Sequence, residues 1–209
     1  MPKITKIVEV ANDDDEMDAM SDEARGDDLE GLRAVARLSK LCGRISWFSA
    51  VGEPLEPSEI ADAEAYVSAL GFPDVSVAAV EDWRAAAAAA QAPDWSQDWW
   101  QAEEQMRKAL LEEALSLNPE HDLMVALTHV STKASEVSHG LAAVSAARAG
   151  VADEALIRVA AGAAAQAAYQ AALVLAADGD AEHPFAVKFR LFEAGRLPLG
   201  IVGNTFNLF

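Results

Sequence analysis

Apolar residues recur at spacings of three and four along most of this 209-residue chain, which is the period of helices with one buried face. Glycines and prolines at helix ends divide the pattern into seven segments. We expect helices over residues 29–51, 57–70, 75–91, 94–117, 119–149, 152–177 and 184–194. The longest segment has a continuous apolar seam, which is typical of a helical bundle. The seam consists of Leu123, Leu127, Val130, Ala134, Val137, Leu141 and Val144.

The pattern changes at both ends of the chain. Residues 3–10 are rich in β-branched side chains, which favours a short strand. Residues 198–209 carry no charge, and Gly203 and Asn204 separate two apolar runs, which predicts a β-hairpin. The sequence therefore predicts an all-α fold. It is a bundle of six to seven helices, with a small antiparallel β element from the N-terminal strand and the C-terminal hairpin.

Composition indicates how the chain is divided. The chain is long enough to bury one sizeable core, and much of its 52% apolar content is alanine, which favours closely packed helices. Residues 12–28 are acidic and almost free of large apolar side chains, as surface linkers are. We expect an N-terminal strand and acidic linker over 1–28 and a helical bundle domain over 29–195. An apolar hairpin over 196–209 then packs on the same domain.

Charge narrows the range of partners. The net charge of −18 disfavours nucleic acid and anionic membranes and favours a basic protein partner. A single cysteine, Cys42, rules out an internal disulfide, and the N-terminus lacks a long apolar run, so we expect a cytoplasmic protein. Residues 159–177 carry no charge and nearly reach membrane-spanning length. Because they are mostly alanine, we interpret them as a central helix buried on all sides.

Glu136 and His139 form a candidate half of a metal site. They are three residues apart in the longest predicted helix, a spacing that puts two ligands on one face. They lie on the flank of the apolar seam, and the chain has no second Glu-x-x-His, which argues against a di-metal site. We expect no resident cofactor. A single divalent metal would bind only if a neighbouring helix brought a third ligand, such as Glu112 or Glu113; otherwise this is a solvated helix surface.

A basic stripe stands out in this acidic chain. Arg33, Arg37, Lys40 and Arg44 recur at spacings of four, three and four on one face of the first predicted helix, and Trp47 lies on the same side. These five residues are a candidate site for an anion or an acidic partner, with Trp47 available for stacking or cation–π contact. The alternative is a surface that pairs with the chain's own acidic linker.

Tryptophans cluster at the start of the predicted helix 94–117. Trp99 and Trp100 differ by about 100° around the helix, so they cannot face one core together with Trp95. At least one of the three packs on a neighbouring helix or lies at an interface. Further along, Glu103 and Arg107 are four residues apart, which indicates a solvated ladder of opposite charges.

The sequence contains no recognisable catalytic motif. There is no Gly-x-Ser-x-Gly, phosphate loop, dinucleotide fingerprint or paired-cysteine metal motif. We therefore favour an acidic helical protein that binds another protein or a second copy of itself, in an interaction or regulatory role, and is not an enzyme. Two other hypotheses stay open. One is a single-metal-dependent helical-bundle enzyme that uses Glu136 and His139, and the other is a small-ligand binder whose site lies among the tryptophans.

Overall fold

The computed structural model describes residues 30–209, and the predicted strand over 3–10 lies outside them. Seven helices and three strands follow one another in this part of the chain. The helices are α2 (Glu30–Cys42), α3 (Pro57–Ala69), α4 (Trp83–Ala90), α5 (Gln97–Leu117), α6 (Glu120–Arg148), α7 (Glu154–Ala176) and α8 (Pro184–Glu193). The strands are β1 (Ser76–Ala79), β2 (Pro198–Val202) and β3 (Thr205–Leu208). The predicted class, a helical bundle with a small β element, is confirmed.

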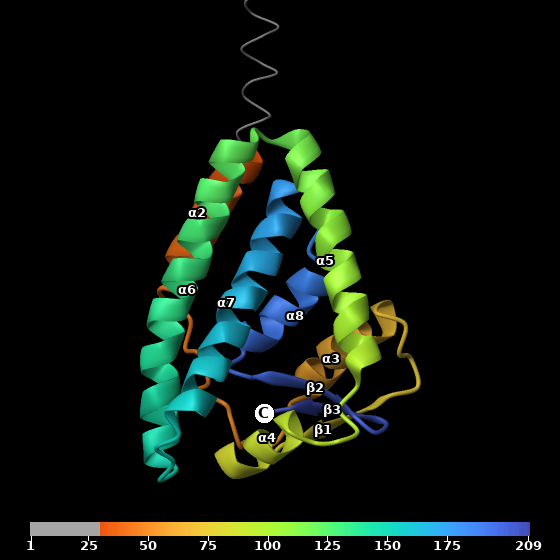
Figure 1. Ribbon diagram of the computed structural model, residues 1–209, viewed down its shortest axis with the longest axis vertical. Helices are drawn as coiled ribbons and strands as arrows, with labels where there is room; N and C mark the ends of the chain where they lie inside the picture. The colour runs from red at the N-terminus through yellow and green to blue at the C-terminus, as the bar shows by residue number, and fades with distance from the viewer. Residues whose placement is uncertain (1–29) are drawn as a thin grey trace, which may run out of the picture.

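The long helices form a V in Figure 1. α5 and α6 are joined at the top and diverge downwards, and α7 lies between them. α7 packs on α6, α2 and α8, while α8 also packs on α3. Alanine allows these helix axes to approach closely, because its side chain is a single methyl group. Buried alanines of α7 in the core include Ala160, Ala164, Ala167, Ala168, Ala171 and Ala172.

The three strands form one mixed sheet below the bundle (Figure 1). β2 and β3 pair as the predicted hairpin, and Gly203 has the positive φ of +58° that its tight turn requires. β1 pairs parallel to β3, so the strand order is β1-β3-β2. Phe206 of β3 is fully buried and packs on Tyr66 and Trp99, which ties the sheet to α3 and α5.

β1 arises from a segment that the sequence predicts as helix. The helix expected over 75–91 begins only at Trp83, because the Asp82 side chain caps it by accepting hydrogen bonds from the backbone N–H groups of Arg84 and Ala85. Residues 75–80, before this cap, are small or β-branched, and Ser76–Ala79 extend along β3. Their pairing with the hairpin is a tertiary contact, so helical periodicity in the sequence does not reveal it.

The first predicted helix is also shorter than expected. α2 ends at Cys42 and not at residue 51, and residues 43–52 form successive turns. Arg196 binds the end of this segment, because its guanidinium donates hydrogen bonds to the backbone carbonyls of Ala50, Glu53 and Pro54. The same guanidinium forms a two-point ion pair with Glu59. This buried side chain from the far end of the chain therefore holds the segment after α2 in a non-helical path.

The apolar seam of α6 follows a different line in its second half. The positions up to Ala134 are buried as predicted, but Val144 is 48% exposed. Ser138, Ala142 and Ala146 face the core in place of the expected larger residues. Their small side chains let α7 approach α6, and the seam leaves its heptad line because a straight helix drifts about 20° per heptad.

α7 is not buried on all sides. It is a helix in residues 30–209 that is long and apolar enough to cross a membrane, and 61% of its most apolar window is buried inside the protein. One face stays open between α5 and α6, where Val159 is 63% exposed and Gly162 is exposed. The expectation of a helix buried all round is therefore wrong, because α5 and α6 diverge and leave this face uncovered.

Candidate functional site

Four helices bring one polar side chain each into the core. The carboxylate of Glu103 on α5 accepts hydrogen bonds from Lys188 Nζ on α8 at 2.6 Å and from Gln170 Nε2 on α7 at 2.6 Å. The Tyr66 hydroxyl on α3 donates to the other carboxylate oxygen at 2.5 Å. None of the four residues is more than 6% exposed. We call Tyr66, Glu103, Gln170 and Lys188 the polar cluster.

The charges of the polar cluster compensate one another. Burial by itself raises the pKa of the Glu103 carboxyl. The Lys188 charge, together with hydrogen bonds from Gln170, Lys188 and Tyr66, outweighs burial and lowers this pKa below its usual range. The carboxylate is therefore ionised at neutral pH. Burial, and next the Glu103 charge, raise the pKa of Tyr66 well above its usual range, so the phenol keeps the proton that it donates.

Of the oppositely charged side chains predicted to lie along the surface of α5, some lie at the surface and one is buried in the core. Glu104 forms a two-point ion pair with Arg107 at the surface, while Glu103 turns inwards. The sequence contains a signal for this. Glu103 is four residues after Trp99 and seven before Leu110, on the buried stripe of its helix, and Lys188 interrupts the phenylalanine stripe of α8. Two opposite charges in two apolar stripes indicate a buried ion pair.

A cavity of about 260 Å³ lies beside the polar cluster. Glu103 and Lys188 are among its lining residues, and nearly all the others are apolar side chains from α4, α5, α7, α8 and β2. We call this cavity the tryptophan pocket. Its principal apolar lining residues are Trp95, Trp99, Trp100, Leu156, Val159, Phe192 and Leu199.

The tryptophans are held in place by β2. Trp95 Nε1–H donates to the carbonyl oxygen of Leu199 at 3.1 Å, and the rings of Trp95 and Trp99 meet edge to face with centroids 5.7 Å apart. Gly200 has a φ of +104°, and a Cβ there would lie 2.8 Å from atoms of both rings. Only glycine therefore allows β2 to approach the two indoles this closely.

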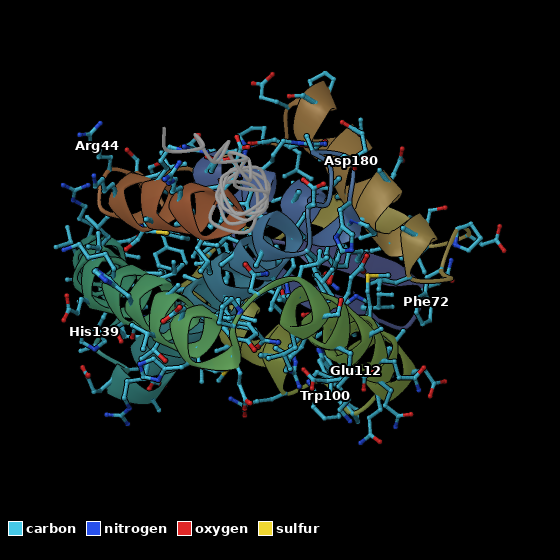
Figure 2. The ribbon with its side chains drawn as sticks, turned by 90° about the horizontal axis from the view of Figure 1, so that it is seen from above. Arg44, Phe72, Trp100, Glu112, His139 and Asp180 are labelled. Carbon is cyan, nitrogen blue, oxygen red and sulfur yellow. The ribbon has the colours of Figure 1, made fainter. Side chains whose placement is uncertain are left out.

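The rim of the tryptophan pocket is apolar and exposed. Trp100 is 48% exposed and Val159 is 63% exposed, although both line the pocket. Figure 2 shows Trp100 at the outer edge of the molecule, on the side of α5. A ligand that enters would therefore pass from water over apolar surface before it reaches the ion pair inside.

The tryptophan pocket continues as a groove along the open face of α7. A second hollow shares Trp100 and Gln166 with the pocket and is also lined by Arg107 and Tyr169. A third hollow shares Ser131 with the second and extends to the predicted metal ligands. The divergence of α5 and α6 thus leaves a continuous depression that starts at the tryptophans.

The two predicted metal ligands lie at the far end of this groove. His139 Nε2 is 3.2 Å from a carboxylate oxygen of Glu154 on α7, and both side chains are partly exposed. Glu112 is on α5, which diverges from α6, and Figure 2 shows it well apart from His139. Within residues 30–209, no group of three His, Cys, Asp or Glu side chains could hold a metal ion. The third ligand that this hypothesis requires is therefore not brought to Glu136 and His139.

Three residues of the basic stripe lie at the surface of α2, whereas Arg44 lies in the turn after it, because α2 ends at Cys42 and not at residue 51. Arg33, Arg37, Lys40 and Arg44 are all exposed, and none of them forms an ion pair with another residue of the described chain. The acidic linker, their alternative partner, lies outside the described residues. Trp47 is only 2% exposed, so its predicted availability for stacking is wrong. Its indole N–H donates to the Cys42 carbonyl, because the chain turns back after α2.

The tryptophan pocket has apolar walls, an open rim and a few convergent polar groups, which are features that small-molecule sites commonly share. No protein-family model, no curated protein and no solved structure matches this chain.

Proposed function

We propose that this protein binds a small, largely apolar molecule in the tryptophan pocket. The observation that carries the proposal is a buried ion pair, Glu103–Lys188, at the inner end of an apolar cavity whose rim is open to water. Apolar cavities with a few convergent polar groups are the usual form of small-molecule sites.

Stability alone does not account for the ion pair. Two charges taken from water lose hydration that their mutual attraction barely repays, and well-packed apolar residues of similar volume usually serve a core equally well or better. Here the pair is placed beside a cavity, not in a filled core. A role in binding explains why charged groups stand at this point.

The size of the pocket sets the strength of binding that we expect. A cavity of about 260 Å³ accommodates a body of the size of a fused double ring. A ligand of about ten heavy atoms that gains roughly 0.5 kcal/mol per atom binds with a Kd of about 0.2 mM. Affinities of this order can be measured by titration.

The proposal is tested by titrating the protein with 2-acetylnaphthalene and following saturation by ligand-observed NMR. Ala163→Phe places a ring in the pocket without touching the ion pair, and we expect it to weaken binding at least about tenfold. Ala155→Phe is the matched control, because Ala155 is exposed on the same helix and does not line the pocket. Binding that is unsaturable, or equal in the two variants, contradicts the proposal.

A second candidate function is binding of a macromolecule through the basic stripe of α2. Three exposed cations on α2, and Arg44 in the turn directly after it, favour this function, because the chain otherwise carries a large excess of negative charge. A partner for this stripe needs an acidic surface, and a second copy of the chain, with its net charge of −18, supplies one. Sedimentation at low and at high salt, with Arg37→Glu as the variant, tests this version. A monomer under all conditions contradicts self-association.

A further inference from the structure

Lys188 has a hydrogen-bond donor to spare. Its ammonium group carries three N–H donors. One is donated to Glu103 Oε1 at 2.6 Å and one to Gln170 Oε1 at 3.1 Å. Within residues 30–209 no third hydrogen bond is formed, and the ammonium group lies over the Tyr66 ring, 5.8 Å from its centroid, near the outer limit of a cation–π contact. A buried donor without an acceptor is costly, so this N–H is ready for an incoming acceptor.

The buried Arg196 shows what a purely structural cation looks like in the same fold. Its guanidinium donates four hydrogen bonds, one to the Glu59 carboxylate and three to backbone carbonyls, and its remaining N–H side lies 2.9 Å from the second Glu59 oxygen in an ion pair. Arg196 therefore needs nothing further, whereas Lys188 lines a cavity with one donor left over. The comparison indicates a structural role for Arg196 and a ligand-binding role for Lys188.

The other unused polar atom nearby is a donor too. Trp99 Nε1 is buried and faces the Tyr66 phenol, but no hydrogen bond of normal geometry from it is formed within the described chain. Trp95, in contrast, already donates to a backbone carbonyl. Among the lining residues, the unused buried groups are thus donors, and the pocket is matched to a ligand that accepts.

Charge then decides which kind of acceptor fits. Glu103 neutralises Lys188, so the pair has no net charge left to offer a ligand. A ligand carboxylate would lose its hydration and also face the Glu103 carboxylate, and a ligand ammonium would face Lys188. An uncharged carbonyl oxygen incurs neither cost.

We infer that the tryptophan pocket takes an uncharged molecule with an apolar body the size of a double ring and one terminal hydrogen-bond acceptor, such as a ketone carbonyl, which receives the spare N–H of Lys188. This inference rests on the proposed function, since it names the ligand class of the same site. The walls of the pocket bind the body, and Lys188 selects the acceptor.

Three probes with the same double ring test the inference on the unaltered protein. 2-Acetylnaphthalene has a neutral acceptor, 2-ethylnaphthalene has none, and 2-naphthoate is an anion. We expect the ketone to bind about tenfold more tightly than the hydrocarbon, which is the usual contribution of a hydrogen bond to a charged donor. We expect the naphthoate to bind at least about tenfold more weakly than the ketone, because its charge is desolvated without a counter-ion.

A matched double variant identifies the group responsible. Glu103→Gln with Lys188→Met removes both charges together, so no unpaired charge is left in the core. In this variant the ketone should lose its advantage and bind like the hydrocarbon, whose own affinity stays unchanged.

Each outcome of the probe series has a distinct meaning. Equal affinity of ketone and hydrocarbon for the unaltered protein overturns the inference and leaves the proposed function standing. Tightest binding of the naphthoate also overturns it, in favour of an anion site. Failure of all three probes to bind refutes the proposed function itself.

Discussion

Removing Lys188 alone should destabilise the protein strongly. Lys188→Met keeps most of the aliphatic volume of the side chain but leaves the Glu103 carboxylate buried without its counter-charge. Breaking one side of a buried ion pair typically costs about 3–5 kcal/mol. For a protein of this size, that corresponds to a fall in Tm of roughly 6–20 °C. The double variant with Glu103→Gln should recover most of this loss, because no charge is then left unpaired.

The pH dependence of the loss has a definite sign. In the unaltered protein the pKa of Glu103 is lowered, so its contribution to stability is present above the unfolded pKa and disappears as the pH falls through the folded pKa. Without Lys188, burial raises this pKa above its unfolded value, so protonation relieves the penalty as the pH falls from neutral. The difference between variant and unaltered protein should therefore shrink towards about pH 5.

Urea denaturation at neutral and at mildly acidic pH measures this difference. The slope of unfolding free energy against urea concentration should be the same for both proteins, so that the midpoints report stability alone. A loss of unfolding free energy below about 1 kcal/mol at neutral pH, or a loss that does not change with pH, refutes this reasoning. It would show that the buried Glu103 carboxylate does not need the charge of Lys188.

Three further predictions concern Gly200, Arg196 and Cys42. Gly200→Ala should cost about 2 kcal/mol or more, seen as a lower urea midpoint and altered tryptophan fluorescence, because its φ of +104° and its contacts with two indoles exclude a methyl group. Arg196→Lys should speed proteolysis between residues 43 and 56, because a single ammonium group cannot reach both Glu59 and three carbonyls. The Cys42 thiol should resist alkylation at pH 8 until the protein unfolds, because burial raises its pKa to about 11.

The glycine prediction has a matched control variant, and each of the three predictions has an outcome that would contradict it. Gly162→Ala should stabilise α7 by about 0.5–1 kcal/mol, because no atom lies within 4 Å of the added methyl group. If the two glycine variants have equal stability, the steric explanation for Gly200 is wrong. If the Arg196→Lys variant is cleaved at the same rate as the unaltered protein, the turns after α2 do not depend on the hydrogen bonds of Arg196. Alkylation of Cys42 at the rate of a free thiol would contradict its burial.

The helical class and the C-terminal hairpin were predictable because they depend on local patterns. Spacings of three and four, prolines at helix starts and the Gly203-Asn204 turn act over a few residues, and the structure confirms the elements that they predict. β1 was not predictable in this way. Its pairing partner lies more than a hundred residues later, and no local pattern records it.

The residues of the candidate site also divide into those that the sequence indicated and those that only the structure revealed. The tryptophan cluster was visible in the sequence, and a ligand site among its members was one of the hypotheses that the sequence left open. The role of Glu103 was missed, because an i,i+4 spacing with Arg107 explained it as a surface residue. The stripe on which it lies was the available signal, but only the approach of α8 shows that Lys188 fills the matching position.

The sequence by itself determined that this chain forms an acidic, alanine-rich helical bundle with a hairpin, because periodicity and turn residues act locally. The tertiary structure alone decided where α2 ends, which face of α7 stays open and which charges meet in the core. Those features depend on contacts between residues far apart in the chain, such as Arg196 with Ala50 and Glu103 with Lys188. Loop closure and desolvation, which no local pattern encodes, govern such contacts.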